Sequence, residues 1–380
     1  MRILIAILGA ALVFVVLWDA FETVVLPRRV ARRVRLTRMF YRATWRPWSA
    51  LVSWIPAGRR RDNYLSFYGP LSLLLLLSLW AAGLVLGFAL LHWGAGSGLT
   101  ISEGTVRFST DLYLSGTTFF TLGLGDVVPR TPFARALTVL ESGMGFGFLA
   151  MVIGYLPVLY QSFSRREVNI TLLDARAGSP PAAAELLRRH NTAHGLEALQ
   201  QFLHDSERWA AELLESHISY PVLAYFRSQH ANQSWLGALT TILDASALVM
   251  VGVEGACARQ AELTFAIARH AVVDLAQVFG TPPRAPATGR LSEADLARLR
   301  ARLAADGLPL REGSDPDARL LVLRQMYEPY VNSLAGYLRL SVPPWMPAAQ
   351  AKDNWQTSAW RQTSRSATPR ARGIAADHHF

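Results

Sequence analysis

The sequence has almost no cysteine and almost no lysine. Cys257 is the single cysteine, so no disulfide can form within the chain, and the redox compartment stays undetermined. Lys352 is the single lysine, so the net charge of +10 comes almost wholly from arginine. Nucleic-acid binding would be one use of that charge. Because the densest arginines flank apolar segments, we expect no nucleic-acid partner.

Two further absences narrow the possible functions. No glycine-rich phosphate-binding loop follows a predicted strand, which argues against a Rossmann-type nucleotide-binding domain. No His-Glu-x-x-His motif is present, and although His190 and His194 are four residues apart, polar core or interface positions explain them better than a metal site. We therefore expect no cofactor, no structural metal and no enzymatic activity.

Long apolar segments dominate the N-terminal half. Hydrophobic residues make up 51% of the 380 residues and mean hydropathy is +0.20, which is high for a soluble protein. The apolar segments at 3–26, 69–93 and 132–163 predict three membrane-spanning helices. His92 marks the outer interface of the second. A further apolar segment, Ser234–Gly252, is interrupted by Asp244, and we interpret it as a buried core helix.

The stretch between the second and third apolar segments is Thr117–Pro129, TTFFTLGLGDVVP. Gly123 and Gly125 are two residues apart, and glycine adopts positive φ at little cost. Positive φ at alternate residues would aim consecutive carbonyls at one axis, where they can replace the water shell of a cation. Irregular backbone is tolerated at membrane depth only where it is buried in protein or lines water. The alternative is an ordinary Gly-x-Gly-Asp turn, against which the flanking apolar helices argue.

The core of this stretch resembles the selectivity filter of the potassium-channel pore-loop superfamily. The resemblance implies a homotetramer with K+ as the permeant ion and Asp126 at the outer mouth. Leu124 stands where the family usually has Tyr or Phe, as in second pore loops of two-pore-domain potassium channels. It cannot make the hydroxyl contacts that brace the filter in Tyr-containing members. The K+-binding residues implied by the resemblance are Thr121, Leu122, Gly123, Leu124 and Gly125.

The resemblance covers residues 66–163 and implies an outer helix, a pore helix at Ser109–Phe120 and an inner helix. Gly145 falls at the position of the family's gating-hinge glycine, with Gly143 as a second candidate. Close helix packing explains such glycines equally well. The expected residues of the cavity and inner mouth are Leu149, Ile153 and Pro157.

Glu141 is a carboxylate inside the predicted inner helix, where such groups are costly and usually functional. It could face the pore and concentrate cations there. It could instead face the pore helix and hydrogen-bond to Thr117 or Ser115 behind the filter, which its place in the outer half of the helix favours. In that position its protonation makes it a candidate pH sensor.

The first apolar segment could be a cleaved signal peptide or a membrane anchor. Cleavage would export the arginine-rich segment that follows, whereas an anchor with its N-terminus outside obeys the positive-inside rule. Arginines interleaved with tryptophans predict an amphipathic helix that binds anionic lipid headgroups. The three-residue spacing of Arg29, Arg32, Arg35 and Arg38 also resembles a voltage sensor, but only one span precedes it.

The second half of the chain has helical periodicity and almost no strand pattern. We expect a regulatory, all-helical cytosolic domain whose ligand is unknown, followed by a disordered basic tail. One long helix is predicted at 317–340 and another at 222–230. The fold class is an all-α membrane protein. Its predicted regions are an N-terminal transmembrane anchor (1–26), a basic interfacial segment (27–65), a pore domain (66–165), a helical cytosolic domain (166–345) and the tail (346–380).

The sequence thus predicts a homotetrameric, potassium-selective channel of the bacterial inner membrane, gated through the inner helix and the cytosolic domain. Two alternatives remain. The first is a non-selective cation channel, with a filter loosened by Leu124. The second is a membrane-anchored enzyme or sensor with a degenerate pore.

Overall fold

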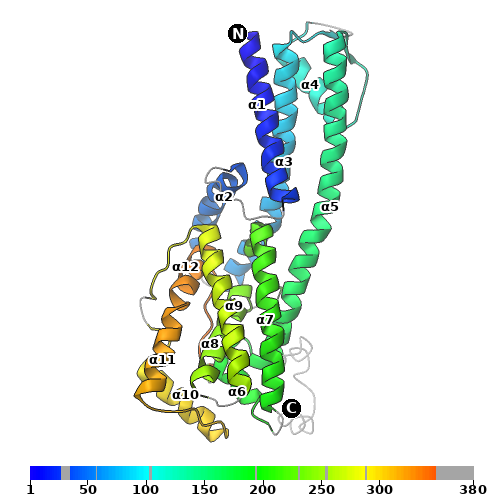
Figure 1. The fold of residues 1–380 in the computed structure, drawn as a ribbon. Helices are drawn as coiled ribbons and strands as arrows, with labels where there is room; N and C mark the ends of the chain where they lie inside the picture. The colour runs from blue at the N-terminus through cyan, green and yellow to red at the C-terminus, as the bar shows by residue number, and fades with distance from the viewer. Residues whose placement is uncertain are drawn as a thin grey trace, which may run out of the picture. The chain divides into compact units, whose positions relative to one another are not determined.

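The computed structural model describes residues 1–26, 35–56, 58–101, 105–192, 195–229, 232–252, 256–286 and 289–347. Within these ranges the chain is almost entirely helical, with one two-stranded sheet (Figure 1). It divides into two compact units, Met1–Ser162 and Phe163–Phe380. The elements up to this boundary are α1 (Arg2–Ala20), the π-helix η1 (Phe21–Val25), α2 (Leu36–Ser53), α3 (Arg59–Gly94), β1 (Leu99–Ile101), α4 (Phe108–Phe119), β2 (Val127–Pro129) and α5 (Pro132–Ala177).

Helices α1 and α3 lie side by side in the first unit (Figure 1). A Cβ added to Gly9 would lie only 2.7 Å from the carbonyl oxygen of Gly87, so the two backbones are nearly in contact. Such close approach through small residues is how helices associate in lipid. Beyond this contact, Asp19 accepts hydrogen bonds from Trp80 Nε1 of α3 and the backbone N–H of Thr37 of α2, each 3.1 Å long. These contacts make α1 part of the packed unit.

The outer helix α3 is longer than predicted. It begins at Arg59 instead of Gly69, so Pro70 lies inside the helix and not at its first position. A proline inside a helix removes one backbone hydrogen bond, and the rest of the helix continues around it. The ring of Tyr68, in the added stretch, packs on Trp45 of α2 with centroids 4.7 Å apart. That contact holds α2 against α3.

The inner helix α5 is also longer than predicted. It extends from Pro132 to Ala177, so the predicted boundary at 165/166 falls inside a continuous helix. The division between the compact units lies at 162/163, also within α5. Its last part belongs to the core of the second unit, where Ile170 and Leu173 are buried.

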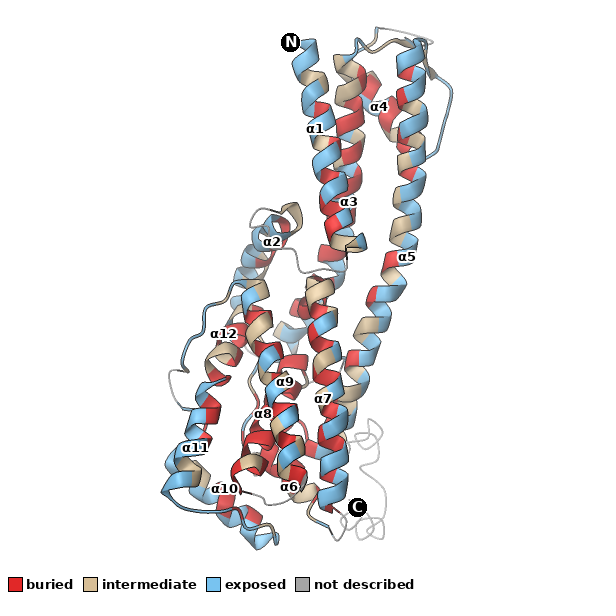
Figure 2. Cartoon of the chain, viewed as in Figure 1, coloured by how far each residue is buried: buried red, intermediate tan, exposed pale blue. Residues whose placement is uncertain are grey.

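Four described helices are long and apolar enough to cross a membrane: α1 with η1, α3, α5 and α8 (Trp235–Gly252). Of the most apolar window of α8, 94% is buried inside the protein, against 17% for α5. Figure 2 shows α8 in the buried class along its length. The carboxylate of Asp244 is paired there with Arg290, with Oδ2 and Nη2 2.6 Å apart. This burial agrees with the predicted core helix.

The second unit is helical throughout its described residues, and two predicted helices were wrong. In its described part, the one at 222–230 is replaced by a 3-10 turn, η2, followed by non-helical backbone up to residue 229. The one at 317–340 is two helices, separated just before Pro329, which lacks the N–H needed to continue a helix. Besides α8, the elements are α6 (Ala183–Arg189), α7 (Gly195–Ser219), η2 (Pro221–Tyr225), α9 (Ala256–Phe279), α10 (Glu293–Ala305), α11 (Ser314–Gln325) and α12 (Glu328–Leu338).

Some predictions fall on residues that the structure does not describe. They concern the arginine-rich stretch at 27–34, His194 and the basic tail from residue 348 onward.

Candidate functional site

The loop between α4 and β2 has an alternating backbone conformation. Thr121, Gly123 and Gly125 have φ values of 59°, 55° and 80°, whereas positive φ is absent at Leu122 and Leu124. The two glycines therefore have the conformation expected from the sequence. Positive φ is a genuine outlier for a β-branched residue such as Thr121, and strain of this kind gathers at functional sites.

Hydrogen bonds hold this loop on the C-terminal end of α4. The N–H of Leu122 donates to the carbonyl of Thr117 (2.7 Å), and the N–H of Thr121 donates to that of Thr118 (3.0 Å). Within the described residues, no hydrogen bond reaches the carbonyl oxygens of residues 121–124. Because backbone carbonyls at membrane depth need a partner, these four are available to a cation. The partial negative charge at the C-terminal end of α4 favours the same ligand.

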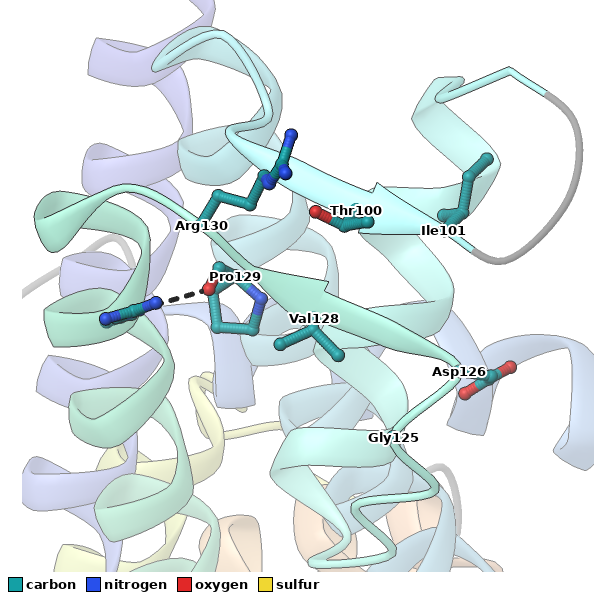
Figure 3. Close-up of a pocket in the computed structure, with 8 residues that line it drawn as sticks. Thr100, Ile101, Gly125, Asp126, Val128, Pro129 and Arg130 are labelled. Carbon is teal, nitrogen blue, oxygen red and sulfur yellow. Dashed lines mark hydrogen bonds between the residues drawn. The ribbon is translucent and has the colours of Figure 1, made fainter.

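The small β-sheet closes the outer side of the loop. Thr100 of β1 pairs with Val128 of β2, inside a segment where the sequence showed no strand pattern. Asp126 precedes β2 and lies at the rim of a pocket that Arg130 also lines (Figure 3). The hydroxyl of Tyr113 of α4 lies near the carboxylate of Asp126. The pore helix therefore brings a tyrosine near the outer mouth, although Leu124 itself has no hydroxyl.

The glycines of α5 differ in their surroundings. A Cβ added to Gly145 would lie 2.0 Å from the carbonyl oxygen of Phe119, at the end of α4. For Gly143 and Gly147, no described atom lies within 4 Å of such a Cβ. Gly145 therefore has a packing role, while hinge roles for Gly145 and Gly143 stay predictions.

The predicted cavity residues lie further along α5. Leu149 and Ile153 have exposed side chains in the single chain, and Pro157 lies inside the helix. That they line a cavity stays a prediction.

Glu141 is fully buried against the pore helix. Its Oε1 is hydrogen-bonded to Ser115 Oγ of α4, one of the two partners predicted for it. Thr117, the other, lies within hydrogen-bond distance of the carbonyls of its own helix. Glu141 Oε2 lies 3.8 Å from Nε2 of His92. The side chain of His92 is only 1% exposed and faces this acid, and its place at the outer interface stays a prediction.

The early histidines of the second unit have partners of their own. His190 Nε2 lies 3.2 Å from Arg176 Nη1, and its Nδ1 lies 2.8 Å from the carbonyl of Leu186. A guanidinium group only donates, so Nε2 is committed as an acceptor. Among the described residues, no cluster of three or more histidine, cysteine or acidic side chains could hold a metal ion.

Arg166 is a buried arginine whose role the sequence did not reveal. Its guanidinium donates to the carbonyls of Leu223 (2.8 Å) and Phe226 (2.9 Å) and lies 3.4 Å from His217 Nε2. Burial and the charge of Arg166 lower the pKa of His217 to about 3. In the sequence, Arg165 and Arg166 form an ordinary basic pair, and nothing distinguishes the exposed one from the buried one.

The first unit has the arrangement of a pore-loop membrane protein. This arrangement consists of a long outer helix, a short helix that ends at a loop with free carbonyls, and a long inner helix. Residues 75–161 match the protein family described as "Ion channel". This match supports the resemblance to the potassium-channel pore-loop superfamily, and the protein is an all-α membrane protein.

A second comparison extends beyond this segment. The chain is 24% identical over 213 residues to the "Uncharacterized membrane protein YdjJ" of Bacillus subtilis (strain 168). The match covers 53% of this chain and 61% of that protein. No solved structure matches the chain.

Proposed function

We propose that the protein is a potassium-selective channel and that K+ passes through the loop of residues 121–125. The observation that carries this proposal is the alternation of positive φ at Thr121, Gly123 and Gly125, with free carbonyls between them. A row of carbonyls aimed at one axis replaces the hydration shell of K+, and ions in adjacent sites drive one another onward. No covalent chemistry and no cofactor is needed.

We further propose a homotetramer, because one chain supplies one filter loop and such a pore is built from about four. The side chains of Leu122 and Leu124 are 62% and 65% exposed in the single chain. Phe146 and Ile153 of α5 are exposed as well. Apolar side chains beside a polar, ion-binding backbone are poorly placed to face water. Neighbouring copies would cover them.

Gating would act through α5. This helix begins directly after the filter segment and ends in the core of the second unit. Arg166 fastens its second half to η2 by hydrogen bonds to Leu223 and Phe226. A ligand that rearranged the second unit could therefore move the inner helix. The chemistry of that ligand stays open.

The proposed location is the bacterial inner membrane, with the N-terminus outside and the second unit in the cytosol. Arginines follow α1 and lie within α5 near residue 165, as the positive-inside rule requires of cytosolic segments. On α2, three exposed arginines recur every fourth residue, which suits anionic lipid headgroups. They are Arg38, Arg42 and Arg46.

Flux from liposomes containing the full-length protein tests the proposal. We expect K+ flux down a potassium gradient, blocked by barium, with little Na+ flux. Gly123→Ala should abolish it, because alanine disfavours the φ of 55° at that position. Gly154→Ala is the matched control, since no described atom lies within 4 Å of the added Cβ and its φ is ordinary. K+ flux that survives Gly123→Ala would contradict the proposed filter.

A non-selective cation channel is the second candidate, favoured by one observation. The side chain of Leu124 is exposed and has no hydroxyl, so it cannot brace the filter by a hydrogen bond. Reversal potentials in mixed Na+ and K+ separate the two candidates. Equal permeabilities would favour this one.

A further inference from the structure

The hydroxyl of Ser115 has two hydrogen-bond partners that it cannot satisfy as a donor at the same time. Its Oγ lies 2.7 Å from the carbonyl oxygen of Val85 in α3 and is also hydrogen-bonded to Glu141 Oε1 in α5. A serine hydroxyl has one proton to donate, and a carbonyl oxygen can only accept. The bond to Val85 therefore uses the proton of Ser115.

Both contacts are hydrogen bonds only if Glu141 carries a proton. A protonated carboxyl group donates through its O–H, and an ionised one only accepts. With the proton present, Glu141 donates to Ser115 and Ser115 donates to Val85. The chain of bonds then joins α5, α4 and α3. Without it, Ser115 can donate to only one of the two helices.

The surroundings of Glu141 fit a site that exchanges protons. Its Oε2 has no hydrogen-bond partner among the described residues, and neither ring nitrogen of the buried His92 has one. Asp111 of α4 is buried close by and accepts a hydrogen bond from Ser97 Oγ (3.0 Å). Three buried polar atoms without a hydrogen bond, on two neighbouring residues, call for a specific explanation.

The charged groups around the site come from four helices. His92 of α3 faces Glu141 directly, and Asp111 of α4 faces His92. On α1, Arg2 lies beside Gly96, at the turn that carries Ser97. On α5 itself, Arg135 points away, toward the carbonyl of Pro129. Two acids and one histidine in a buried cluster hold a net charge that depends on how many protons they share.

We propose that Glu141 is a proton-binding site and that its proton controls the link between the pore helix and the helices on either side of it. The proposal rests on the proposed channel function, because α4 carries the filter loop on its C-terminal end. Loss of the proton at high pH releases α4 from one neighbour. It also places a negative charge 3.8 Å from Nε2 of His92.

Infrared difference spectroscopy tests the proton itself, without any need for ion flux. A pH titration of the full-length protein in liposomes should show the carbonyl band of a protonated carboxyl that disappears as the pH rises. Glu141→Gln should lack this band, because glutamine is nearly isosteric and has no carboxyl group. Glu212→Gln, which changes an exposed glutamate, should keep it. A band that persists in Glu141→Gln, or no such band in the wild type, would overturn the assignment.

Potassium flux tests the consequence. Wild-type flux should fall by about fivefold or more as Glu141 loses its proton, the change expected for one net hydrogen bond. Glu141→Gln should conduct equally at all pH values, since its amide group donates to Ser115 permanently. A variant that follows the wild-type pH curve, or a wild type with pH-independent flux, would overturn the control by protonation. If no pH supports K+ flux, the channel proposal fails, and the infrared result still decides the proton site.

Discussion

The contact between Gly145 and the pore helix leads to a quantitative prediction. A Cβ at position 145 would lie 2.0 Å from the carbonyl oxygen of Phe119, and real Cβ atoms essentially never approach an atom closer than 3.0 Å. In Gly145→Ala, α5 and the end of α4 must therefore separate by at least about 1 Å. The obstacle is backbone, so no rotamer change can relieve it. Overpacking of this kind costs about 1–3 kcal/mol.

The displaced atoms lie two residues before Thr121, so the substitution should disturb the filter more than the rest of the protein. We expect Gly145→Ala to assemble and to lose at least about tenfold in K+ flux in liposomes, the factor that corresponds to about 1.4 kcal/mol. Gly143→Ala, on the same helix, meets no described atom within 4 Å and should retain flux.

This pair of variants also separates packing from a gating hinge. Alanine stiffens a helix at either position to a similar extent, by about 1 kcal/mol relative to glycine. A hinge spread over this glycine cluster therefore predicts that both substitutions impair opening. Equal flux in Gly145→Ala, Gly143→Ala and the wild type would refute the argument from the clash.

Two further predictions concern stability. Asp19→Ala should lower the apparent melting temperature of the full-length protein, because it leaves the indole N–H of Trp80 and the backbone N–H of Thr37 without an acceptor, at about 1–3 kcal/mol each. The control Asp205→Ala removes a side chain that is 61% exposed and should leave the melting temperature unchanged. Equal melting temperatures for Asp19→Ala and the wild type would contradict the hydrogen bonds of Asp19. The folded pKa of His217 is about 3, below its ordinary 6.5, so the unfolded chain takes up this proton first as the pH falls. Stability is then complete above pH 6.5 and is lost toward pH 3, by about 1.4 kcal/mol per pH unit. His217→Gln should show a shallower acid slope in melting temperature than the wild type, and identical slopes would show that His217 is not buried in its neutral form.

The sequence was informative wherever a feature depends on neighbours along the chain. The apolar segments, the pore helix and the paired glycines are local patterns, and the structure places helices and positive φ at those positions. Helix ends were less predictable because they depend on contacts from elsewhere. The predicted helix after Val222 is absent, and Arg166, far away in sequence, donates to the carbonyls of Leu223 and Phe226 in that segment.

Local patterns predicted only part of the cluster behind the pore helix. Glu141 was recognisable because a carboxylate in an apolar helix is conspicuous, and Ser115 was one of its two expected partners. His92 had the ordinary position of an interfacial residue, at the end of an apolar helix. Its side chain is buried and faces Glu141 of α5. Residues 92, 115 and 141 lie on three helices, and only the fold that brings those helices together gives the acid a histidine and gives Ser115 a second acceptor. The proposed proton-controlled contact is therefore a property of the assembled pore unit, because none of these helices alone contains all of its groups.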